Sequence, residues 1–186
     1  YFFDRARQEL GDAAGSHFIA ITDPGSKMEK ASEESGFWKT FYGEPKIGGR
    51  FSALSDFGMV PLAAMGVDVA EFLLRARSMA KECRLPASQN PGVRLGVALG
   101  TAWKMGRDKL TIIAEKGIFD LGAWMEQLVA ESTGKHGKAI IPVDREPLIT
   151  PENYGADRVF VYIALDGEAA FADDVAAIEA AGHPVI

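Results

Sequence analysis

Short, nearly uninterrupted apolar runs constrain the fold of this chain more than any other feature of its sequence. Runs of this kind are typical of strands that lie buried on both faces of a parallel sheet. They stand at residues 17–22, 109–114, 138–143 and 158–165, and a further short strand is expected at 39–42. Helix-like segments separate them, and strand–helix–strand units with short loops build α/β sandwiches. We therefore expect an α/β protein of doubly wound parallel sheets flanked by helices, a three-layer α/β/α sandwich.

Periodicity and capping residues predict the helices between these strands. Ser26 or Asp23 is suited to cap a helix at 27–35, and Asp68 is suited to cap another. A segment near 51–62 has apolar residues at roughly helical spacing, which predicts a helix that is buried on most sides. The other helices are expected at 1–10, on either side of Gly66 between 61 and 83, and at 93–104, 121–132 and 171–181, and a last strand begins at 184.

The composition excludes several classes of function. The formal net charge of −6 argues against a nucleic-acid surface, which is normally basic. No run of about 18 apolar residues occurs, so we expect no membrane-spanning helix. Cys83 is the only cysteine, which excludes an internal disulfide and indicates a reducing, cytoplasmic location. One cysteine and three scattered histidines also lack the spacing of a zinc site.

Two glycines precede an arginine at Gly48-Gly49-Arg50. Glycine can take backbone angles closed to other residues and lets a ligand lie against the main chain. Arginine is planar, permanently charged and suited to oxyanions. If the segment that follows begins a core helix, its N–H groups would also favour an anion. This stretch is a candidate anion site, and a purely structural turn is the alternative.

A second candidate site lies on the helix expected at 121–132. Gln127 and Glu131 are four residues apart, so both side chains lie on one face of that helix. Glu131 is in the last turn, where the negative end of the helix dipole disfavours its ionised form. This makes it a better proton acceptor near neutrality. The alternative is a solvated ion pair between Glu131 and Lys135, four residues apart.

These two motifs together resemble the phosphoglucose isomerase family. Gly48-Gly49-Arg50-Phe51-Ser52, with Ser55 and Gly58 beyond it, is similar to the first signature of that family. Glu131-Ser132-Thr133-Gly134-Lys135, with Gln127 one turn upstream, is similar to its catalytic-glutamate helix. The resemblance covers nearly the whole chain and is closest to the isomerase half of bifunctional transaldolase/glucose-6-phosphate isomerases.

The resemblance implies a fold of paired sugar-isomerase (SIS) domains. Residues 1–66 would be the latter part of the first SIS domain, 67–108 connecting helices, and 109–186 the second SIS domain, truncated at its C-terminus. We therefore expect this chain to be a piece of a longer protein, because it begins at Tyr1 without a methionine and stops where a strand begins. By the same resemblance, an isolated piece of this kind would be inactive.

The implied reaction interconverts glucose 6-phosphate and fructose 6-phosphate through a cis-enediol, without a metal or an organic cofactor. By motif, Glu131 would be the base and Arg50 would stabilise the enediolate. Gly49 would offer its main chain to the sugar, and Gln127 would help to fix it. The family pattern also implies a homodimer. The phosphate-binding loops and the ring-opening acid would lie outside this chain, although His136 is close enough in sequence to Glu131 to be considered.

Two other functions remain open at this stage. SIS domains also serve as non-catalytic sugar-phosphate-binding modules, which need no base. The joint presence of Glu131 and Arg50 favours the enzyme, because proton abstraction beside a carbonyl needs both a base and an anion stabiliser. The chain could also act mainly as an assembly surface.

Overall fold

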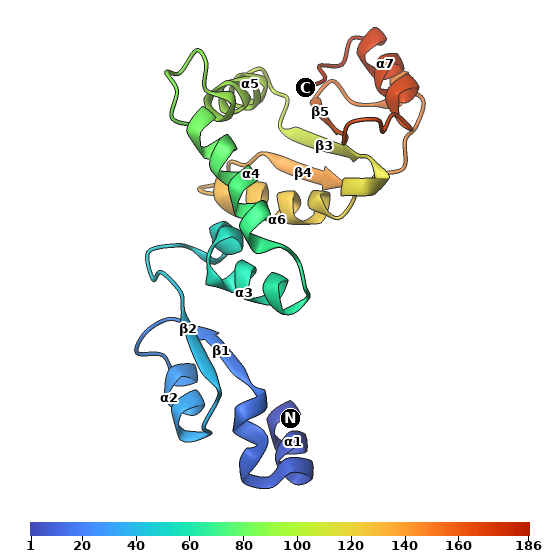
Figure 1. Cartoon of the computed structure of the whole chain (residues 1–186). Helices are drawn as coiled ribbons and strands as arrows, with labels where there is room; N and C mark the ends of the chain where they lie inside the picture. The colour runs from blue at the N-terminus through green and yellow to red at the C-terminus, as the bar shows by residue number, and fades with distance from the viewer. The chain divides into compact units, whose positions relative to one another are not determined.

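The computed structural model describes all 186 residues. It is an α/β structure whose strands pair in parallel in two sheets, which confirms the predicted fold class. The chain divides into two compact units, Tyr1–Ala80 and Lys81–Ile186, and Figure 1 labels their helices and strands. None of the helices combines the length and the apolar character that crossing a bilayer requires.

The first unit is organised around one β–α–β unit. Strands β1 (Ile19–Thr22) and β2 (Lys39–Tyr42) pair in parallel along their whole length. Helix α2 (Lys27–Glu34) connects them, and the Ser26 hydroxyl caps it by accepting the N–H of Glu29 at 3.1 Å. Both the strand–helix–strand order and the cap agree with the sequence. Helix α1 (Phe2–Leu10) and the 3-10 helix η1 (Gly11–His17) precede this unit.

The prediction of one buried helix near 51–62 is wrong. The segment forms a 3-10 helix, η2 (Gly49–Leu54), followed by a separate helix, α3 (Asp56–Ala64). Ser55 between them is extended, and its hydroxyl accepts the N–H of Phe57 at 3.3 Å. The helical period therefore restarts after Ser55, and the segment is not one continuous helix.

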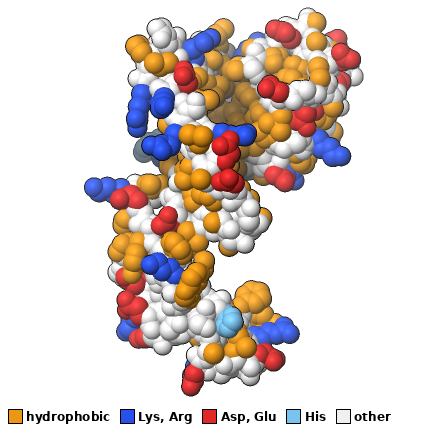
Figure 2. Space-filling view, viewed as in Figure 1, with side chains coloured by type: hydrophobic (Ala, Val, Ile, Leu, Met, Phe, Trp, Pro, Cys, Tyr) orange, Lys and Arg blue, Asp and Glu red, His pale blue; other side chains and the backbone are white.

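Most apolar side chains of these two helices reach the surface. Phe51 and Leu54 are 58% and 54% exposed, and only Met59 of α3 is buried. Apolar side chains are visible over much of the molecular face shown in Figure 2. A helix that is hydrophobic on all sides is normally buried, so these exposed side chains differ from the expectation.

Gly58 sets how closely α3 packs on η2. A Cβ built on Gly58 would lie 1.9 Å from the carbonyl oxygen of Ala53, which is closer than any side chain tolerates. Only glycine allows this approach of the two backbones. The glycine that follows the arginine motif therefore has a packing role.

The chain then turns at Gly66, whose φ is +85°, and enters α4 (Val69–Glu82). The Asp68 carboxylate accepts the N–H of Glu71 at 3.0 Å, as a residue that caps a helix does. The helix break at Gly66 and the Asp68 cap are thus confirmed.

The second unit contains a three-stranded parallel sheet. Its order is β4 (Ile141–Asp144), β3 (Lys109–Ala114), β5 (Arg158–Ile163). The chain end adds to the edge of β5, where the Phe160 N–H donates to the Pro184 carbonyl at 2.9 Å. The chain end thus pairs with β5 where the sequence predicts a strand, but only through an isolated bridge at Val185. Strand β4 begins later than expected, because residues 135–138 form a tight turn.

Helices cover both faces of this sheet. On one face, Leu110, Ile112 and Ala114 of β3 pack with Ala102 of α5 (Pro91–Lys104) and with side chains of α6 (Leu121–Thr133). On the other face, Ile113 packs with side chains of α7 (Ala172–Ala180). Alternate residues of one strand thus face opposite helix layers, as a three-layer sandwich requires. The second unit confirms the predicted α/β/α arrangement.

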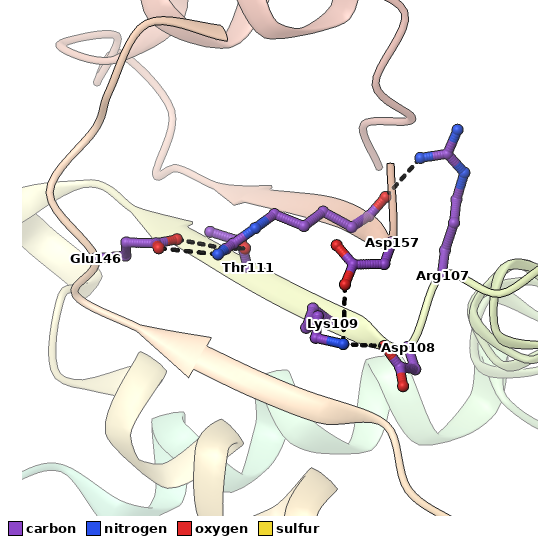
Figure 3. A network of polar contacts seen from close by, with 7 residues as sticks. Arg107, Asp108, Lys109, Thr111, Glu146 and Asp157 are labelled. Atoms are coloured by element: carbon purple, nitrogen blue, oxygen red, sulfur yellow. Dashed lines mark hydrogen bonds and ion pairs between the residues drawn. The ribbon is translucent and has the colours of Figure 1, made fainter. Parts of the chain in front are cut away.

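Charged residues tie together the amino ends of β3 and β5 (Figure 3). The Lys109 ammonium lies 2.6 Å from the Asp108 carboxylate and 2.9 Å from that of Asp157. The hydrogen bond with Asp108, followed by that with Asp157, raises the pKa of Lys109. The Arg158 guanidinium crosses the sheet to bind Thr111 at 2.7 Å and Glu146 at 3.0 Å. These contacts fix the start of the strands that carry the rest of the unit.

Candidate functional site

Gly49 and Arg50 lie together at the start of η2, in the first unit. Gly48 has φ −65°, and neither glycine of the pair adopts a positive φ. The pair therefore makes no use here of the backbone angles that are open to glycine alone. A Cβ built on Gly49 would meet nothing within 4 Å, so this side of the main chain is open to a ligand.

Arg50 does not sit at the start of a core helix. It belongs to η2, and the α-helix begins only at Asp56. The carbon of its guanidinium lies 5.0 Å from the ring centroid of Phe51, which makes a cation–π contact. The Ser52 hydroxyl donates to the Gly49 carbonyl at 2.6 Å and holds the turn. The helix-terminus part of the anion-site prediction is thus wrong, whereas the arginine itself remains a candidate.

Gln127 and Glu131 lie on α6, in the second unit. Both are exposed, on the side of the helix away from Met125 and Val129, which pack on the sheet. The predicted helix, and the shared face that follows from its geometry, are confirmed. The structure thus groups two predicted residues in each unit, Gly49 with Arg50 and Gln127 with Glu131.

Glu131 lies near the amino ends of the strands of its own unit. Thr133, two residues later, accepts the N–H of Ile140, which directly precedes β4, at 2.9 Å. Ligands of doubly wound sheets usually sit at the carboxyl ends of strands. Glu131 departs from that expectation because α6 runs back antiparallel to the strands, so its last turn returns to their amino ends.

The three histidines differ in their surroundings. His136 is exposed, with φ +54°, in the tight turn after α6. The His183 Nε2 lies 3.0 Å from the Pro151 carbonyl, and His17 ends η1. No three His, Cys, Asp or Glu side chains gather closely enough to hold a metal ion.

The carboxyl ends of β3 and β4 carry a separate cavity of about 200 Å³. Arg145, one of the residues that line it, has φ +57°. Its guanidinium binds Asp120 at 2.8 Å and lies 4.4 Å from the ring centroid of Phe119. None of the four residues proposed from the sequence lines this cavity.

Glu115 is a buried carboxylate that sequence reasoning missed. It directly follows β3, is 1% exposed, and accepts the N–H of Phe171 at 2.9 Å and the hydroxyl of Tyr162 at 2.6 Å. The Phe171 N–H and then the Tyr162 hydroxyl hold the pKa of Glu115 below its ordinary value, although burial opposes this. The same contact raises the pKa of Tyr162 to about 12. The sequence signal that could have pointed to this buried carboxylate is a glutamate placed directly at the end of an apolar run.

We expect Glu115→Gln to lower the melting temperature at pH 7 by about 5 °C, because a charge-assisted network is lost. The folded pKa of Glu115 lies below the unfolded value of about 4.3. The contribution of ionised Glu115 to the stability of the fold is therefore complete above that pH and is lost as the pH falls through the folded pKa. Thermal unfolding of both proteins between pH 7 and pH 3 should show the difference shrinking. Glu179→Gln, an exposed change in the same unit, is the control, and a constant difference down to pH 3 contradicts the prediction.

The fold belongs to a known architecture. The structure superposes on that of a hypothetical protein of Thermus thermophilus with a TM-score of 0.79 and 20% identity, over 99% of this chain and 54% of that one. At this identity the likeness establishes the fold alone. No family model matches the sequence.

Curated relatives of this chain are named glucose-6-phosphate isomerase. The protein of Thermosynechococcus vestitus is 34% identical over 131 residues, 69% of this chain and 25% of that protein. That of Heliobacterium modesticaldum is 32% identical over 70% of this chain and 30% of its own length. That of Parabacteroides distasonis is 28% identical over 97% of this chain and 41% of its own length. The chain thus spans between a quarter and two fifths of these relatives.

Proposed function

We propose that this chain belongs to the phosphoglucose isomerase family and is a segment of an enzyme that interconverts glucose 6-phosphate and fructose 6-phosphate. The observation that carries the proposal is the similarity to curated glucose-6-phosphate isomerases, which reaches 97% of this chain in one relative. The exposed Glu131 at the end of α6 supports it, because an aldose–ketose isomerase needs a base that substrate can reach.

In this reaction Glu131 is the base. Its carboxylate removes the C2 proton of open-chain glucose 6-phosphate, and the electron pair left behind forms the cis-enediolate. A proton then passes from the C2 oxygen to the C1 oxygen, and the same carboxyl group returns a proton to C1, which gives fructose 6-phosphate with its carbonyl at C2. The step needs no redox partner, because C1 is reduced as C2 is oxidised within one molecule.

The other three residues assist that proton transfer. Arg50 stabilises the negative charge that develops on the enediolate oxygen, a contact stronger in the transition state than in the substrate. The open side of Gly49 lets the sugar approach the main chain, and Gln127 hydrogen-bonds to the sugar from the helix face that it shares with Glu131. No metal or organic cofactor takes part in this scheme.

The proposal includes the wider architecture of the parent protein. Residues 1–66 and 109–186 would belong to two SIS domains joined by helices at 67–108, and the cytoplasmic enzyme would act as a homodimer. Phosphate-binding loops and the ring-opening acid would come from other parts of the parent, which could also carry a transaldolase domain. The segment alone would then be inactive.

The experiment is the conversion of glucose 6-phosphate by the full-length protein in D₂O. A base that solvent can reach, as the exposed Glu131 is, exchanges the proton between removing and returning it, so deuterium should appear at C1 of fructose 6-phosphate. Product without any deuterium would contradict transfer by a solvent-accessible base and would count against the role of Glu131. Binding of fructose 6-phosphate without turnover would favour the alternative, a non-catalytic sugar-phosphate-binding SIS module.

A further inference from the structure

The last turn of α6 leaves carbonyl oxygens without partners in the helix, as every helix end does. Here the neighbouring chain supplies their donors. The Gly134 N–H binds the Ala130 carbonyl at 2.8 Å. The Lys135 ammonium binds the carbonyl of Glu131 at 2.8 Å and that of Ser132 at 3.0 Å. One lysine thus holds the main chain of the proposed base itself.

Lys135 is held in turn by a tight reverse turn. Its N–H donates to the Lys138 carbonyl at 2.9 Å, and the Lys138 N–H donates back at 3.0 Å. The two residues between them, His136 and Gly137, have φ of +54° and +72°. Two successive positive φ values define the type I′ turn, a favoured two-residue connection between antiparallel segments. The turn therefore fixes the main chain of Lys135, from which its ammonium reaches the carbonyls of α6.

Thr133 connects the same helix end to the sheet. Its hydroxyl donates to the Val129 carbonyl at 2.8 Å and accepts the N–H of Ile140 at 2.9 Å. The last turn of α6 is thereby fastened both to the chain that enters β4 and to the turn that carries Lys135. These contacts leave the Glu131 main chain with little freedom.

The position of Lys135 also has an electrostatic consequence. The C-terminus of a helix carries a partial negative charge, and a nearby cation offsets it. The Lys135 ammonium therefore stabilises the end of α6 that carries Glu131.

We propose that Lys135 is a positioning residue for Glu131, which it serves by clamping the carbonyls of Glu131 and Ser132. This assignment rests on the proposed isomerase function. It differs from the side-chain ion pair considered from the sequence, because the contact on which it rests is to the main chain. Lys135 is exposed, so its removal should cost little stability.

The test compares three variants of the full-length protein with wild type. Lys135→Met is expected to lower kcat about 10- to 100-fold, the usual cost of losing a residue that orients a reacting group. KM should change less than about two-fold, because binding of the ground state is untouched. Lys135→Arg, which keeps the charge and can reach the carbonyls, should restore most of kcat.

Lys138→Met is the matched control. It removes the same charge from the same turn, but the Lys138 ammonium lies 5.9 Å from the ring centroid of Trp103 and makes no contact with the α6 carbonyls. We expect it to keep kcat within about two-fold of wild type.

The outcomes separate this assignment from the function on which it depends. An active wild type whose kcat is unchanged in Lys135→Met overturns the clamp alone. Equal losses in Lys135→Met and Lys138→Met also overturn it, because the effect would then be one of net charge. A full-length protein without isomerase turnover overturns the proposed function and the clamp together.

Discussion

Replacing Glu131 by glutamine is expected to lower the isomerase kcat of the full-length protein about 10²- to 10⁴-fold, the usual contribution of a general base. Glutamine keeps the size and hydrogen-bonding groups of glutamate but cannot accept a proton. The side chain is exposed near the end of α6, so the fold should tolerate the change. A coupled assay of fructose 6-phosphate turnover measures the loss, and thermal unfolding checks that the fold persists.

Glu126→Gln on the same helix is the matched control for charge. Glu126 is also exposed, but it lies about 140° around the helix from Glu131. The control should keep wild-type turnover. If both variants turn over substrate like the wild type, Glu131 is only a residue at a helix end, and the assignment of the base is wrong.

Replacing Arg50 by methionine should lower kcat about 10²- to 10³-fold, as the loss of one group that stabilises a developing oxyanion does. Methionine keeps much of the aliphatic length and removes the charge. Arg50→Lys should recover little, because a point charge does not reproduce a planar guanidinium. Steady-state kinetics with fructose 6-phosphate separates the effect on kcat from that on KM.

Lys46→Met provides the matched control for Arg50. Lys46 is an exposed cation four residues earlier in the same stretch, so the variant removes the same charge from the first unit. Its turnover should stay near that of wild type. A rise in KM at constant kcat in Arg50→Met would instead make Arg50 a ground-state binding residue.

Much of the local structure follows from sequence features that act over a few residues. The apolar run at 109–114 matches β3 residue for residue, because a strand buried on both faces needs apolar side chains at successive positions. Ser26 and Asp68 cap helices as expected, because a capping hydrogen bond spans only three residues. The common face of Gln127 and Glu131 likewise follows from helix geometry alone.

The tertiary structure decided what depends on distant partners. The apolar residues near 51–62 proved largely exposed, since periodicity cannot show where Ser55 interrupts a helix or what packs against it. The burial of Glu115 is compensated by hydrogen bonds from Phe171 and Tyr162, which are 56 and 47 residues away.

The same division applies to the candidate site. Sequence spacing by itself determined that Glu131 shares a face with Gln127 near the end of a helix, because both residues belong to one short segment with a regular repeat. Only the folded chain placed that helix end at the amino ends of the strands and set Lys135 on the main-chain carbonyls of Glu131 and Ser132. These features depend on the direction in which α6 returns along the sheet and on the turn that follows it, which the repeat within a segment does not specify.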